Sequence, residues 1–264
     1  LLRWMNYRDI PHALKPGRFR LNTGWTPQQV IDQLVNGSPL LDRVTIPEGL
    51  AWWEVGKRLE EAQMVRFEDF DKLVHDPAFL RHWGIPFDSA EGFLFPDTYL
   101  IMRPLELNEA TAKSVVGRLI DNFWRRTAPL WPGGKRPGPS GRDEVRRLVT
   151  LASIVERETA VPSERPRVAG VYANRLRLNM LLQADPTTAY GLGESFDGNL
   201  RRKHLDDEGN PYNTYKHLKA AANPEQHDYI YFVARGEDGS HVFSTNLAAH
   251  NKAVREYWAK RRGK

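Results

Sequence analysis

Two glutamates near the end of a predicted helix, Glu156 and Glu158, are the residues best suited to acid–base chemistry. Residues 148–159 contain no Gly or Pro, and their apolar residues recur at the spacing of one helical face. At about 100° per residue, both carboxylates border this face. A carboxyl group at such a border can be partly desolvated, which raises its pKa and lets it donate a proton near neutral pH. The predicted apolar face consists of Leu148, Leu151, Ala152 and Val155.

The same spacing also fits two solvated glutamates that take no part in a reaction. Charged residues at the border of an apolar helical face are usually solvated, and from spacing alone this is the commoner outcome for both glutamates. Asp143 is expected to cap the start of the helix, and Pro162 lies just beyond its end. Position on a helix therefore does not by itself choose between a catalytic and a solvated Glu158.

Six sequence blocks, spread over about two thirds of the chain, carry a specific resemblance. The block around the glutamates reads LASIVERETAVPSER from residue 151. The others are EGFLFPDTY from residue 91, VYANRL from 171, LQADPTTAYG from 182, YNTY from 212 and FSTNLAAHN from 243. In their order along the chain, the six blocks resemble those of the YceG-like family of bacterial endolytic murein transglycosylases, also called the MltG family. By its place in the motif, Glu158 corresponds to the catalytic acid of that family.

The resemblance implies a lytic transglycosylase that cleaves the β-1,4 bond between N-acetylmuramic acid and N-acetylglucosamine inside nascent peptidoglycan strands. Such enzymes use one glutamate as acid and then as base, because the 6-hydroxyl of the muramic acid residue closes a 1,6-anhydro end. Glu158 would take both roles, and Glu156 is expected to be structural or orienting. The residues expected to contact the glycan are Gln183, Asp185, Thr187, Tyr190, Asn213, Tyr215 and Asn246.

Each of these polar residues also fits a turn or a helix cap, Asp185 above all, because Asp before Pro is common at helix starts. No cofactor is implied. The eight histidines, His250 among them, show no metal-ligand spacing, so no metal site is predicted. No phosphate-binding Gly-rich loop or serine nucleophile motif is present either, and the absence of Cys excludes disulfides and thiol catalysis.

The chain is expected to be α+β, and the resemblance implies a small LysM-like (βααβ-type) subdomain in residues 1–65. A larger, mainly helical catalytic domain with a β-hairpin follows in residues 66–264. In the first part the pattern predicts a strand around residues 18–21, a helix over 27–36 with a Thr26–Gln29 capping box, a strand over 44–46 and a helix over 50–59. The tandem Trp52 and Trp53 fit glycan docking and core packing equally well.

In the second part the pattern predicts mostly helices. Short helices are expected within residues 65–87, an irregular Gly- and Pro-rich loop over 132–141, and a hairpin from 229–234 and 241–243. Helices are also expected over 108–124, 163–178 and 247–260, and a short helix is expected to end at Gly191.

The net charge of +5 and the pI near 9.4 favour polyanionic partners, or simply solubility with a basic tail over residues 260–264. No nucleic-acid-binding signature accompanies this charge, so nucleic acid is not an expected partner. No apolar run approaches the roughly 20 residues that cross a bilayer. The family carries an N-terminal transmembrane anchor, which we expect to be missing from this chain. The resemblance thus implies location at the outer face of the bacterial cytoplasmic membrane, with glycan strands and peptidoglycan synthases as partners.

One departure from the family leaves a second function open. Family members carry a Gly/Pro-rich segment after the Asn-Thr-Tyr motif, whereas here Tyr215 continues through Lys216 and His217 directly into residues 218–224. Without that segment, part of the glycan cleft would be open. The alternative is a non-catalytic peptidoglycan-binding protein that uses its LysM-like subdomain.

Overall fold

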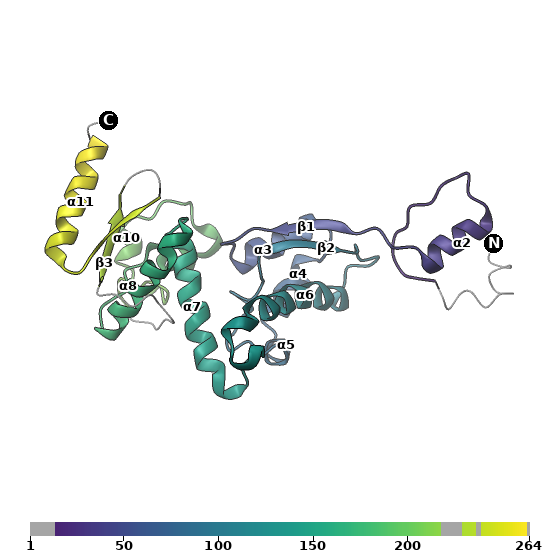
Figure 1. Ribbon diagram of the computed structural model, residues 1–264, viewed down its shortest axis with the longest axis horizontal. Helices are drawn as coiled ribbons and strands as arrows, with labels where there is room; N and C mark the ends of the chain where they lie inside the picture. The colour runs from purple at the N-terminus through teal and green to yellow at the C-terminus, as the bar shows by residue number, and fades with distance from the viewer. Residues whose placement is uncertain (1–13, 218–228, 236–238, 263–264) are drawn as a thin grey trace. The chain divides into compact units, whose positions relative to one another are not determined.

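The computed structural model describes residues 14–217, 229–235 and 239–262 (Figure 1). These residues are mainly helical and contain two small antiparallel sheets, which confirms the α+β class. By their internal contacts they form two compact units, described separately below. The first unit is Leu1–Phe79 with Phe93–Thr127, and the second is Leu80–Gly92 with Ala128–Lys264. The division into domains at residues 65 and 66 stays a prediction.

The first described helix of the first unit follows the predicted capping pattern closely. Helix α2 (Pro27–Asn36) begins after Thr26, whose hydroxyl accepts the Gln29 backbone N–H at 3.4 Å. The Gln29 side-chain oxygen in turn accepts the Thr26 backbone N–H at 2.8 Å. The capping box is therefore confirmed.

The strand predicted over residues 18–21 is wrong, because this segment is irregular and the Leu21 side chain is 46% exposed. Strand β1 (Asp42–Ile46) confirms the next prediction, yet its partner is the distant strand β2 (Asp97–Ile101). The two pair antiparallel, with Val44 opposite Tyr99. Because residues 18–21 form no strand, the strand pair predicted within residues 1–65 is absent, and the LysM-like subdomain is not confirmed.

The remaining helices of the first unit bury an apolar core. Leu59, Phe70, Leu119 and Ile120 are all fully buried where α3 and α6 contact α4. Trp52 stacks on Phe67 with 6.3 Å between ring centroids, and both tandem tryptophans are partly buried. These helices are α3 (Trp52–Glu61), α4 (Phe67–Val74), α5 (Pro77–His82), which crosses into the second unit, and α6 (Glu109–Thr127).

Helix α7 (Arg142–Glu158) confirms the predicted helix of the two glutamates and packs on two neighbours, α8 (Arg165–Arg177) and α9 (Asp185–Gly191). Two details of the prediction are wrong. Asp143 lies inside the first turn and Gly141 occupies the cap position. Ala152 is exposed and Ile154 is buried, because these tertiary neighbours, which the sequence does not reveal, decide which face is covered.

The rest of the second unit matches the predicted hairpin and C-terminal helix. Strands β3 (Tyr231–Ala234) and β4 (His241–Ser244) pair antiparallel, and α11 (Leu247–Arg262) packs on both (Figure 1). No helix in the described ranges is long and apolar enough to cross a membrane. The other elements are α10 (Arg202–Leu205) and the 3-10 turns η2 (Ala128–Leu130), η3 (Pro132–Gly134), η4 (Pro139–Gly141), η5 (Pro162–Glu164) and η6 (Gly193–Ser195).

Candidate functional site

Glu158 is the last residue of α7, and its carboxyl group meets a tyrosine from the next helix. The hydroxyl of Tyr172, in α8, donates a hydrogen bond to Glu158 Oε1 at 2.7 Å. Tyr172 is only 1% exposed, while Glu158 is partly buried. The two helices are held together by a cluster of buried apolar residues, of which Leu151 and Val168 are members. The site is thus an acid side chain at the edge of a packed core.

The surroundings raise the pKa of the Glu158 carboxyl above its ordinary value of 4.5, mainly because burial disfavours the charged form. The Tyr172 hydrogen bond opposes this shift, since it stabilises the carboxylate. Among the charged neighbours, Asp185 raises the pKa further, whereas His241 and Arg175 lower it. Glu158 therefore holds its proton at a higher pH than an exposed glutamate does.

This raised pKa predicts how Glu158→Gln changes the stability of the folded chain with pH. As pH rises past 4.5, Glu158 ionises in the unfolded chain but stays protonated in the folded one, so the wild type loses stability until the folded pKa is passed. Gln does not titrate. Thermal unfolding should therefore show little difference between the two proteins near pH 4 and a more stable variant near pH 8. An equal difference at both pH values would contradict a raised pKa.

A second tyrosine–carboxylate pair lies close to the first. The Tyr215 hydroxyl donates a hydrogen bond to Asp185 Oδ1 at 2.6 Å, at the start of α9. Burial and the negative charges of Asp185 and Glu158 raise the pKa of Tyr215, so its hydroxyl keeps its proton. Asp185 itself is exposed. Two of the residues expected to contact glycan are therefore near Glu158 and hold each other in place.

The turn that carries Gln183 is fixed by Thr214. The Gln183 backbone N–H bonds to the Thr214 carbonyl oxygen at 3.0 Å, and the Ala184 N–H bonds to the Thr214 hydroxyl at 2.9 Å. Gln183 has a φ of 51°, in the left-handed region that is costly for a residue with a side chain, and its side chain is exposed. The Thr187 hydroxyl bonds to the Ala184 carbonyl oxygen at 2.8 Å and so closes the first turn of α9.

Tyr190 contacts a residue of the EGFLFPDTY block rather than Glu158. Its hydroxyl donates to Glu91 Oε2 at 3.1 Å, and its ring meets the ring of Tyr212 edge to face at 5.0 Å. Both partners belong to the second unit. Two of the six sequence blocks therefore meet at this pair, about 100 residues apart in the chain.

The structure gives Asn213 and Asn246 local roles in the backbone. The Asn213 side chain is fully buried, and its amide bonds to the carbonyl oxygens of three residues in α10 and the loop after it. Asn246 is exposed, and its side-chain oxygen accepts the Ala249 N–H at 2.9 Å at the start of α11. These bonds occupy the amide of Asn213 and the side-chain oxygen of Asn246, and contact of either residue with glycan stays a prediction.

Four polar residues around Glu158 were not predicted from the sequence. Tyr172, Arg175 and the Glu164–His241 pair received no individual role. Glu164 Oε2 lies 2.9 Å from His241 Nδ1, and Arg175 Nε bonds to the Ile230 carbonyl oxygen at 2.9 Å. All of these contacts link helix α8, or the turn before it, to the hairpin. The sequence signal was the presence of Tyr172 and Arg175 in the VYANRL block and of Glu164 in the LASIVERETAVPSER block.

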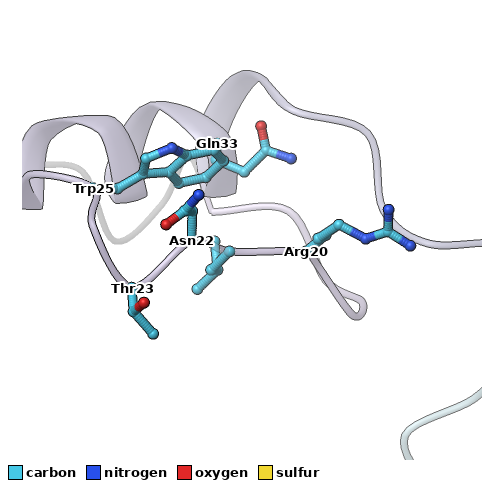
Figure 2. Close-up of a pocket in the computed structure, with 6 residues that line it drawn as sticks. Arg20, Asn22, Thr23, Trp25 and Gln33 are labelled. Atoms are coloured by element: carbon cyan, nitrogen blue, oxygen red, sulfur yellow. The ribbon is translucent and has the colours of Figure 1, made fainter.

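A separate pocket of about 540 Å³ lies beside α2 in the first unit. Figure 2 shows the indole of Trp25 next to the amide groups of Asn22 and Gln33. The lining contains no carboxylate, so acid catalysis has no donor there. The lining residues are Arg20, Leu21, Asn22, Thr23, Trp25 and Gln33.

Comparison with known proteins gives one consistent family. Residues 1–256 match the family model described as the YceG-like family. A Bacillus subtilis (strain 168) protein named endolytic murein transglycosylase is 26% identical over 275 residues, which cover 93% of this chain and 73% of that protein. A protein of the same name from Streptococcus pneumoniae serotype 2 is 25% identical over 299 residues. That match covers 97% of this chain but 52% of the Streptococcus protein, so the chain spans about half of that relative.

Comparison with solved structures points to the same family. A solved structure of a YceG-like protein from Listeria monocytogenes matches with a TM-score of 0.62 at 25% identity. The match covers 94% of this chain and 88% of that chain. Sequence and fold thus agree over nearly the whole chain.

Proposed function

Because the chain belongs to the YceG-like family, we propose that it is a lytic transglycosylase that cleaves peptidoglycan glycan strands, with Glu158 as acid and base. The names of its relatives support the substrate and the reaction class. The observation that carries the assignment of the acid is the environment of Glu158: burial raises the pKa of its carboxyl, and Tyr172 holds one of its oxygens. A carboxyl group of this kind is suited to deliver a proton near neutral pH.

In the first step, the neutral Glu158 carboxyl gives its proton to the oxygen that joins N-acetylmuramic acid to N-acetylglucosamine. The bond between this oxygen and C1 of the muramic acid residue breaks, and positive charge develops at C1. Glu158 becomes a carboxylate that Tyr172 stabilises through its hydroxyl.

In the second step, the Glu158 carboxylate removes the proton of the 6-hydroxyl of the same muramic acid residue. The freed oxygen attacks C1 and closes a 1,6-anhydro ring. Glu158 regains its proton, and no water is consumed. Gln183 and Asp185, which are exposed, together with Thr187 and Tyr215, supply hydrogen-bonding groups for sugar hydroxyls and N-acetyl groups around this carboxyl.

The experiment that tests this proposal is digestion of long, purified glycan strands. An endolytic enzyme first produces fragments of intermediate length, whereas cleavage from the ends releases disaccharides from the start. We expect intermediate fragments whose ends have the mass of 1,6-anhydro-N-acetylmuramic acid. Strands that remain intact under conditions in which the chain is folded would contradict the proposal.

A binding role for the first unit is a second, compatible proposal, supported by the pocket in Figure 2. An aromatic face beside two amide groups is suited to a sugar ring and its N-acetyl group. Trp25→Ala should weaken co-sedimentation with insoluble peptidoglycan roughly tenfold and leave cleavage of short soluble strands unchanged. Equal co-sedimentation of variant and wild type would remove the pocket from the binding surface. If wild-type chain binds but never cleaves, the non-catalytic alternative holds.

Location and partners complete the proposal. We place the activity at the outer face of the cytoplasmic membrane, where nascent strands leave the synthases, with an anchor supplied by a helix that is not among the described residues. Cross-linking of the full-length protein in cells should recover peptidoglycan synthases. Recovery of cytoplasmic proteins alone would contradict this placement.

A further inference from the structure

Tyr172 determines which oxygen of Glu158 carries the acid proton. We propose that it is a positioning residue whose hydroxyl bond to Oε1 leaves Oε2 as the oxygen that gives and takes the proton. This inference rests on the proposed function for its catalytic meaning. The hydrogen bond itself can be tested without any substrate.

The Tyr172 side chain is fixed from two sides. It is 1% exposed in the cluster between α7 and α8, and its ring meets the ring of Phe232 edge to face at 5.9 Å. Within the described residues, Glu158 Oε1 is its single hydrogen-bond partner. At 1% exposure, the Tyr172 hydroxyl has almost no contact with water.

The direction of the hydrogen bond follows from this isolation. If Oε1 carried the proton and donated it to Tyr172, the tyrosine hydrogen would have no acceptor in its buried surroundings, which is costly. The alternative arrangement satisfies both groups, because the hydroxyl donates and Oε1 accepts. Burial and the neighbouring Glu158 also raise the pKa of Tyr172 well above its ordinary value, so the hydroxyl remains a donor throughout the pH range of interest.

The second oxygen of Glu158 has the opposite environment. Oε2 has no hydrogen-bond or ion-pair partner among the described residues, and it is not fully buried. With Oε1 occupied as an acceptor, the proton of the neutral acid must lie on Oε2. The less enclosed oxygen is therefore the one that carries the proton.

The same bond serves both steps of the proposed reaction. When Oε2 loses its proton, the bond from Tyr172 to Oε1 becomes a bond to a charged group and strengthens. It thus stabilises the carboxylate at the moment at which it forms, and it keeps Oε2 in place for the return of a proton from the 6-hydroxyl. Loss of this bond should lower kcat more than it changes KM.

Four other groups act on the titration of Glu158. Asp185 on α9 raises its pKa, while His241 on β4 and Arg175 on α8 lower it, and Tyr215 lies close enough to respond to its charge. None of these groups is altered by Tyr172→Phe. A change in the pKa of Glu158 in that variant therefore reports the lost hydroxyl.

The test is a pH titration of the carboxyl carbon of Glu158 by NMR in chain labelled with ¹³C-glutamate. Glu158→Gln assigns the signal by its disappearance. In Tyr172→Phe we expect the pKa of Glu158 to rise by about one pH unit, the alkaline fall of kcat to move by the same amount, and kcat to drop about tenfold with little change in KM. Tyr99→Phe is the matched control, because Tyr99 is also a buried tyrosine whose hydroxyl bonds to an acceptor elsewhere, the Phe95 carbonyl oxygen.

An unchanged pKa of Glu158 in folded Tyr172→Phe would overturn the inference. If that variant does not fold, the hydroxyl proton of Tyr172 in the wild type decides: its chemical shift must change with pH in step with Glu158, and a constant shift overturns the inference. Failure of the wild type to cleave strands would reject the proposed function instead, since the NMR result is independent of cleavage.

Discussion

Replacing Glu158 with Gln is expected to lower the formation of anhydro ends at least about a hundredfold, because the variant can neither donate nor accept the proton. The fold should persist. Gln has nearly the same shape, and its amide oxygen can accept the hydrogen bond that Tyr172 donates to Oε1 in the wild type. The measurement is the initial rate of anhydro-end formation from purified strands, counted by mass spectrometry.

Glu156→Gln is the matched control, two residues earlier on the same helix. Glu156 forms an ion pair with Arg165 at 3.3 Å, and its side chain is 31% exposed, so it is solvated and already paired with a cation. We expect activity within about threefold of the wild type, since a partly exposed ion pair contributes little to the free energy of folding. Equal losses of activity in both variants would show that the environment of Glu158 does not distinguish it from Glu156 as the catalytic acid.

The largest loss of stability is expected for Asn213→Ala. The Asn213 side chain bonds to the carbonyl oxygens of His204, Leu205 and Asp207 and accepts the Thr188 hydroxyl and the Tyr215 N–H. Removal of these bonds leaves several polar groups without partners in a buried place. We therefore expect the free energy of unfolding to fall by about 3 kcal/mol.

Urea denaturation measures this loss, with Asn246→Ala for comparison. Asn246 makes a single cap bond at the exposed start of α11, so its removal should cost about 1 kcal/mol. Similar small losses in both variants would show that the Asn213 amide does not organise its loop. In that case its expected contact with glycan would become the better explanation for its presence in the motif.

Local signals predicted the elements well where the residues that define an element are close in sequence. The capping box of Thr26 and Gln29 lies within four residues, and α2 begins where that pattern places it. Gly and Pro likewise marked the loop over residues 132–141, which contains only the short turns η3 and η4. Such signals depend on the backbone of one segment, so the sequence contains all the information they need.

Elements that depend on a distant partner were predicted poorly. The alternation of Phe19 and Leu21 with arginines is typical of a strand, yet no strand pairs with it, and the segment stays irregular. Strand β2, which begins inside the EGFLFPDTY block, was missed because its partner β1 lies more than 50 residues earlier in the chain. Pairing between such segments is decided by the packing of the whole unit.

The candidate site was likewise predicted only in part, because its contacts join residues that are distant in the sequence. The motif identified Glu158, and the helical pattern placed it at the border of an apolar face, as the structure does. The bonds that define its environment, Tyr172 to Glu158 and Tyr215 to Asp185, join residues 14 and 30 positions apart on different elements. The expected change after Tyr215 falls at residues 218–224, outside the described residues, and the openness of the cleft there stays a prediction.

The central claim is that Glu158 transfers a proton to and from the sugar without consuming water, and cleavage in H₂¹⁸O tests it most directly. We expect new ends with the mass of 1,6-anhydro-N-acetylmuramic acid and without ¹⁸O, formed by the wild type and absent with Glu158→Gln. Reducing ends that contain ¹⁸O would show hydrolysis by water and would contradict the account. Anhydro ends that still form at the wild-type rate in Glu158→Gln would contradict it equally.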